Sequence, residues 1–129
     1  MQRPYETERR EFARVNVDVP VRYKFLSREH PVPDEIFEGR CANLSGGGLL
    51  LLGRVPDEGL LAPLLTHRVL VGVVLQLPTL AEPIKALCRV GWIESHPGRE
   101  RVPLGLTFRE ITREHQDAIF RYVIRAHLP

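Results

Sequence analysis

The sequence predicts an all-β fold in which six short antiparallel strands form a small barrel or closed sandwich, followed by one amphipathic helix. Three observations support this fold class. The N-terminal half holds a long alternation of apolar and polar residues, and turn residues recur at short intervals without intervening helices. The apolar spacing changes to a helical period only near the end of the chain.

The first strand is the clearest element. From Val15 to Phe25 every second residue is apolar, which is typical of a strand with one face in the core and one face in water. Pro20 lies on the polar side of this strand. Because proline lacks a backbone N–H, its presence suggests an edge position or a bulge.

Turn signals separate the remaining strands. Ser27 to Asp34 predicts a hairpin loop, Ser45 to Gly48 a break, and residues 56–65 a loop with room for a helical turn. The other strands are expected at residues 36–44, 49–52, 69–77, 84–94 and 102–108, with a turn at residues 96–99.

The last element is a helix. Thr112 is a suitable N-cap and Glu114 in the first turn complements the helix dipole. Ile119, Tyr122, Val123 and Ala126 then follow at helical spacing, so they are expected to face the barrel.

Length and composition indicate a single globular domain. The chain has 129 residues, of which 43% are hydrophobic and 26% charged. The longest apolar run, Val69 to Leu77, is too short to span a membrane, and residues 1–10 lack the apolar segment of a secretory signal. We therefore expect a cytoplasmic protein without membrane insertion, in which Cys41 and Cys88 are free thiols packed as small apolar groups.

The charged residues give a weaker signal. A net charge of +2 is too small to predict binding to duplex DNA. All basic residues except Lys24 and Lys85 are arginines, which suit bidentate contacts with phosphate and with guanine. A GC-rich genome explains most of this excess, although not the positions of particular arginines.

Catalytic motifs are absent from the sequence. It contains no GxSxG, HExxH, GxxxxGK[ST] or GxGxxG motif. The five histidines never fall at metal-ligand spacing and have no acidic pair beside them. The sequence therefore predicts no catalytic residues, no metal site and no cofactor.

Two short motifs point to a ligand instead. Arg10 and Arg14 form an RxxxR pair ahead of the first strand, but this spacing recurs elsewhere in the arginine-rich chain and means little alone. The run from Asn43 to Gly48 fits [DN]xSxxG, a pattern that chance produces in about one in a hundred such chains. One interpretation is a turn held by Asn43 and Ser45, and the other is a backbone that a ligand approaches closely.

The two motifs together suit a guanine nucleotide. Arginine pairs with guanine O6 and N7, stacks on the purine plane and binds phosphate. Asn and Ser oxygens accept hydrogen bonds from guanine N–H groups, and glycines leave room for a base. A nucleoside triphosphate site would need a P-loop or magnesium carboxylates, which the sequence lacks.

These motifs, with Arg89 to Trp92 and Leu104 to Phe108 ahead of a terminal helix, resemble the PilZ domain family over nearly the whole chain. The family more often has Asp where this chain has Asn43, and a neutral amide accepts hydrogen bonds less strongly than a carboxylate. The resemblance implies a split, Greek-key-like six-stranded antiparallel β-barrel with a C-terminal α-helix. It also implies binding of the bacterial second messenger cyclic di-GMP.

The resemblance assigns roles to single residues. Arg10 and Arg14 would clamp guanine and phosphates, Asn43 and Ser45 would read the guanine edge, and Gly48 would permit the tight turn. Arg9 would help to bind a stacked pair of ligand molecules; the alternative is a solvated charge among acidic neighbours.

The same resemblance predicts how the chain is organised and how it acts. Residues 1–13 are expected to be a flexible arm that carries the Arg motif and wraps over bound ligand, and residues 14–129 to be the barrel domain. We expect a receptor or adaptor without enzymatic activity. It would regulate a protein partner in a process such as motility, biofilm formation or secretion.

Two alternatives stay open. The first is a PilZ-like adaptor that acts without the nucleotide and uses the apolar run Leu60 to Leu65 as a contact surface, although ordinary loop packing also explains this run. The second is an OB-like or Sm-like barrel that binds single-stranded RNA through exposed aromatic residues. The alternation places Tyr23, Phe25, Trp92 and Phe108 in the core, which argues against RNA binding.

Overall fold

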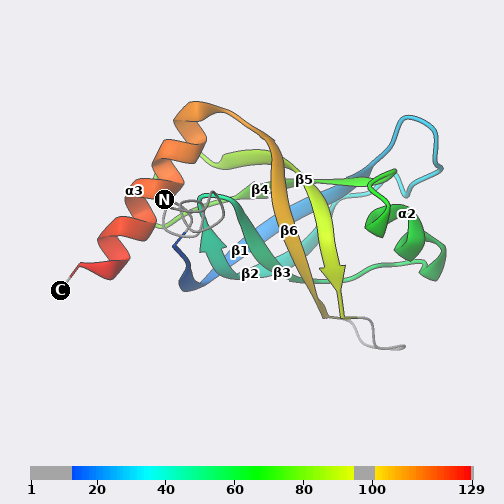
Figure 1. The fold of residues 1–129 in the computed structure, drawn as a ribbon, viewed down its shortest axis with the longest axis horizontal. Helices are drawn as coiled ribbons and strands as arrows, with labels where there is room; N and C mark the ends of the chain where they lie inside the picture. Colours follow the sequence, from blue (N-terminus) through cyan, green and yellow to red (C-terminus); the bar gives the residue numbers. More distant parts are fainter. Residues whose placement is uncertain (1–12, 95–100, 129) are drawn as a thin grey trace, which may run out of the picture.

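A computed structural model describes residues 13–94 and 101–128 of the chain. Its six strands close into a barrel in the order β1-β2-β3-β6-β5-β4, and every neighbouring pair is antiparallel. Helix α3 lies at one end of the barrel and α2 at the other (Figure 1). The predicted fold class is therefore confirmed. The elements are β1 (Val15–Leu26), β2 (Phe37–Ser45), β3 (Gly48–Gly53), the 3-10 turn η1 (Glu58–Leu60), α2 (Leu61–Leu65), β4 (Leu70–Leu75), β5 (Ile84–Ile93), β6 (Val102–Ile111) and α3 (Arg113–His127).

Strand β1 supplies an aromatic cluster to the core. Tyr23 and Phe25 are buried, as their alternation predicts, and both pack against Phe37 with ring centroids 5.5 Å away. The Tyr23 hydroxyl donates to the Arg54 carbonyl oxygen at 2.8 Å and accepts from the Arg54 N–H at 2.6 Å. The buried phenol therefore has partners for its polar atom.

A bulge accommodates Pro20. The register between β1 and β2 shifts between Asn16 and Val19, just before the proline. On the other side of β1, pairing with β4 begins only at Val21. Pro20 thus lies beside a bulge and beyond the end of the β4 ladder, where a missing N–H is tolerated.

The prediction that Trp92 lies in the core is wrong. The register between β5 and β6 shifts so that Val90 pairs with Leu106 and Trp92 with Gly105. This bulge turns Trp92 to the outer face, where it is 49% exposed and its indole covers Gly105. Phe108, which was also expected in the core, is half-buried and packs against the outside of the core.

The segment from Leu60 to Leu65 is not an exposed apolar run. It forms a 3-10 turn and a short helix in which Leu60 and Leu64 are buried in the core, while Leu65 is 46% exposed. The Asp57 carboxylate caps the turn by accepting from the Gly59 N–H at 2.8 Å. Packing accounts for most of this segment, so it offers little support for a docking surface.

Helix α3 begins at the predicted cap. The Thr112 hydroxyl accepts from the His115 N–H at 3.1 Å, and Ile119 and Val123 are buried against the barrel. Ala126, expected on the same face, is exposed. None of the helices in the described part of the chain is long and apolar enough to cross a membrane.

Candidate functional site

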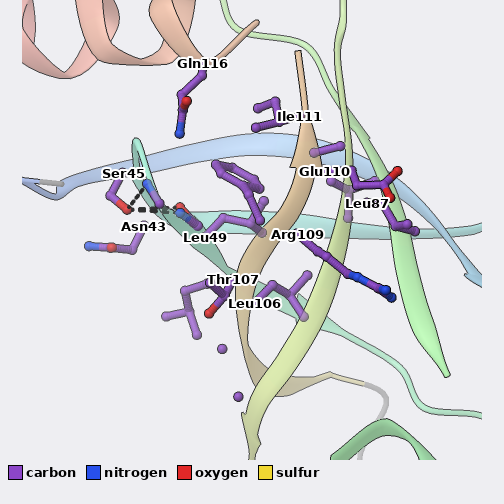
Figure 2. Close-up of a pocket in the computed structure, with 18 of the residues that line it drawn as sticks. Asn43, Ser45, Leu49, Leu87, Leu106, Thr107, Arg109, Glu110, Ile111 and Gln116 are labelled. Carbon is purple, nitrogen blue, oxygen red and sulfur yellow. Dashed lines mark hydrogen bonds between the residues drawn. The ribbon is translucent and has the colours of Figure 1, made fainter. Parts of the chain in front are cut away.

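The turn between β2 and β3 carries the [DN]xSxxG motif, and Ser45 holds it together. The Ser45 Oγ accepts from the N–H groups of Gly47 and Gly48 at 3.1 and 3.2 Å, and lies 3.3 Å from the Gly48 carbonyl oxygen, to which it donates. Only 5% of Ser45 is exposed. The hydroxyl therefore maintains the shape of the turn in this structure (Figure 2).

Two other elements fix the same turn. The Phe108 N–H of β6 donates to the Gly47 carbonyl oxygen at 2.9 Å. From α3, the Gln116 Nε2 donates to the Gly46 carbonyl oxygen at 3.0 Å. The motif thus lies where β2, β3 and β6 meet the terminal helix. A displacement of α3 would act on it through the hydrogen bond of Gln116.

Gly48 is needed for strand packing. A Cβ at this position would overlap the carbonyl oxygen of Leu106 on β6, and the φ angle of Gly48 is outside the left-handed region. Close approach of a neighbouring strand is therefore a sufficient reason for glycine at this position, and the role in the turn that was expected for Gly48 stays a prediction.

Asn43 and Arg14 lie closer to solvent. Asn43 is half-buried, and its Nδ2 donates to the Asn16 Oδ1 at 3.2 Å. Arg14 is exposed just before β1, and its carbonyl oxygen accepts from the His127 Nε2 of α3 at 3.0 Å. Arg9 and Arg10, the other predicted ligand contacts, lie outside the described residues.

An open depression joins these residues. It has a volume of about 2020 Å³, extends from the β2–β3 turn over the outer surface of the barrel, and includes Arg14, Asn43, Ser45 and Gly48 in its lining. Because small-ligand pockets usually measure about 300–1,000 Å³, this depression is a broad open surface and not an enclosed cavity.

The depression is cationic. Among the residues that the structure describes, the charged lining side chains are those of Arg14, Lys24, Lys85 and Arg109 together with one carboxylate, Glu110. Lys24 also pairs with Asp34, outside the lining, at 2.8 Å. Because Asp34 compensates the charge of Lys24, the excess of positive charge in this part of the lining comes from Arg14, Lys85 and Arg109, and it attracts an anionic ligand such as a phosphodiester.

Thr107, Arg109 and Gln116 are among the lining residues that sequence reasoning missed. The first two lie on the outer side of β6, and the alternation of polar and apolar residues in that strand could have identified them. Figure 2 shows Arg109 extending toward β5, away from Asn43 and Ser45. Gln116 was beyond sequence reasoning, because its partner Gly46 is 70 residues away.

The thiols do not form a nucleophilic site. Cys41 and Cys88 are free and buried, as predicted. Burial raises the pKa of Cys41 to about 11 and that of Cys88 to about 12, so both are protonated at neutral pH. In the described part of the chain, no group of three or more His, Cys, Asp or Glu side chains could hold a metal ion.

Comparison with solved structures shows the same barrel elsewhere. The inhibitor of motility MotI/DgrA from Bacillus subtilis superposes with a TM-score of 0.63 at 21% identity, over 91% of this chain and 50% of MotI. MrkH from K. pneumonia, solved with c-di-GMP, gives a TM-score of 0.61 at 16% identity, over 97% of this chain and 52% of MrkH. The present chain thus spans about half the length of each.

A third structure matches as an isolated domain. The PilZ domain of YcgR from Escherichia coli, solved with c-di-GMP, gives a TM-score of 0.59 at 12% identity, over 92% of this chain and 91% of that domain. A search of curated proteins finds no match. A family model described as the PilZ domain matches residues 8–125, which is most of the chain. The chain therefore belongs to the PilZ domain family.

Proposed function

We propose that this chain is a receptor for cyclic di-GMP that performs no reaction on its ligand. The observation that carries the proposal is the cationic depression, in which the exposed Arg14 lies on the same surface as Asn43 and the Ser45 turn. The c-di-GMP complexes of the YcgR domain and of MrkH, which share the fold, add support.

In this proposal the motif residues have different tasks. The Arg14 side chain is exposed, and its guanidinium can pair with a guanine edge or a phosphate. Asn43 accepts from guanine N–H groups. Ser45 and Gly48 act mainly through the backbone, because the hydroxyl is already engaged in the turn and the glycine makes room for β6.

The arm provides the response in this proposal. Arg10 joins Arg14 on the ligand, Arg9 contacts a second, stacked ligand molecule, and residues 1–13 close over the bound nucleotide. The hydrogen bond between His127 and the Arg14 carbonyl oxygen links the start of β1 to α3. Movement of the arm would therefore reach α3, and through it a protein partner in motility, biofilm formation or secretion.

Calorimetric titration with cyclic di-GMP tests the proposal. The parent chain should bind with a dissociation constant well below about 100 µM. Arg10→Ala and Arg14→Ala should each weaken binding at least tenfold, since each loses a charge-assisted contact. Arg22→Ala is the matched control, because Arg22 is exposed on β1 and does not line the depression.

Each outcome has a defined meaning. A parent chain without measurable affinity at 100 µM overturns the receptor function, and the nucleotide-independent adaptor replaces it. A stoichiometry of two ligands per chain that falls to one in Arg9→Ala supports the role of Arg9. One ligand per parent chain removes that role.

A further inference from the structure

Two asparagines face each other beside the candidate site. Asn16 of β1 lies directly opposite Asn43 of β2 in the strand register, and the Asn43 Nδ2 donates to the Asn16 Oδ1 at 3.2 Å. Both residues line the cationic depression. They are the only asparagines in the chain.

Irregular pairing surrounds this pair of residues. The β1–β2 register shifts between Asn16 and Val19, and the β2–β3 register shifts between Cys41 and Asn43. Bulges bend strands and redirect side chains, and they occur frequently beside binding sites. Asn16 and Asn43 stay paired with each other at the edge of the first shift, and Asn43 also pairs with Leu50 of β3 at the edge of the second. The side-chain hydrogen bond between Asn16 and Asn43 therefore lies where two ladders change register.

The hydrogen bond decides which end of the amide is available. A free asparagine amide can turn over and present either its two N–H donors or its oxygen acceptor. In this structure Asn16 engages the Nδ2 end. We infer that Asn16 is a positioning residue that fixes the Asn43 amide with its oxygen toward the ligand, and so makes the site select guanine over adenine.

The selectivity follows from the chemistry of the two bases. Guanine carries N–H donors at N1 and N2, which an oriented oxygen accepts. Adenine has an acceptor at N1, whereas a freely rotating asparagine can pair with its N6 and N7. A site with a fixed acceptor discriminates strongly against a base that lacks the matching donor. Asn16 would thus give the neutral Asn43 the acceptor behaviour of an aspartate. This inference rests on the proposed cyclic di-GMP function.

The test compares dissociation constants for cyclic di-GMP and cyclic di-AMP. In Asn16→Leu and Asn16→Ala the Asn43 amide loses its partner, so the preference for the guanine ligand should fall about tenfold. Asn16→Asp keeps an oxygen acceptor for Nδ2 and should retain the preference. A carboxylate added there repels both dinucleotides equally, so the ratio of the two constants is the appropriate readout.

Gln76→Leu is the matched control. It removes an exposed amide that donates to the Leu80 carbonyl oxygen at 2.6 Å, outside the depression, so the preference should stay as in the parent. Nitrogen-15 NMR of the free parent chain adds a measurement that needs no substitution. The side-chain amide protons of Asn43 should exchange with solvent slowly, and the side-chain amide protons of Asn16 should exchange faster.

The outcomes separate the two proposals. A parent chain that does not bind cyclic di-GMP overturns the proposed function and this inference together. Normal binding with an unchanged ratio in Asn16→Leu and Asn16→Ala overturns the inference alone. If neither variant folds, rapid exchange of the Asn43 side-chain N–H groups in the parent overturns it, and slow exchange supports it.

Discussion

Gly48 and Leu106 are in contact across β3 and β6 so closely that a Cβ on Gly48 would overlap the Leu106 carbonyl oxygen. The obstacle is backbone, which cannot turn aside as a side chain can. This contact explains why the last residue of the [DN]xSxxG motif is glycine in this chain, and it has a direct consequence for mutagenesis.

Gly48→Ala should lower the free energy of unfolding by about 1–3 kcal/mol, because β3 and β6 must separate to admit the methyl group. Urea denaturation measures this change. Gly91→Ala is the control, since its Cβ would lie 3.6 Å from the Gly105 carbonyl oxygen, an ordinary contact. Equal stabilities of the two variants would contradict the packing role of Gly48.

Ser45→Ala should cost about 1–2 kcal/mol of stability, because the buried Gly48 N–H and its neighbour lose their acceptor. Thr66→Ala is the control: the Thr66 hydroxyl is exposed and bonds to carbonyl oxygens at the end of α2. Urea denaturation of both variants should precede any binding measurement. If Ser45→Ala is as stable as the parent but loses ligand, the hydroxyl contacts the ligand directly.

Gly105→Ala should displace the indole of Trp92 while costing less stability than Gly48→Ala. The added methyl group meets the indole ring, which is a movable side chain on the outer face. Trp92 is the only tryptophan, so its fluorescence reports this change without interference. Acrylamide should quench the variant more strongly than the parent, and unchanged quenching would show that the indole does not depend on Gly105.

The buried thiols should make the folded state less stable at alkaline pH. Folding raises the pKa of Cys41 from 9.0 to about 11 and that of Cys88 from 9.0 to about 12, so the folded state favours the protonated thiols. The two protonated thiols therefore contribute fully to the free energy of unfolding below pH 9, and this contribution declines as the pH rises toward 11 to 12. At pH 10.5 the free energy of unfolding should be lower than at pH 7 by about 1–2 kcal/mol for each thiol.

Urea denaturation at pH 7, 9 and 10.5 checks this decline. The Cys41→Ala/Cys88→Ala variant should lose less stability above pH 9 than the parent. Some decline should persist in it, because burial also raises the pKa of Tyr23. Identical pH profiles for parent and variant would contradict the assignment to the thiols.

The sequence by itself determined the strands, the terminal helix, their order and the motif that marks the site. Alternation from Val15 to Phe25 and the cap at Thr112 are local properties, set by strand and helix geometry and by residues close in the chain. They could be predicted because no distant contact is needed to specify them.

Only the tertiary structure decided how distant residues meet. Trp92 leaves the core because β5 is bulged against β6, and a bulge is a property of two paired strands. Gly48 is explained by Leu106, and the Asn43 amide is held by Asn16. Each of these contacts joins separate strands, so it depends on the register that barrel closure sets, which the pattern of a single strand does not contain.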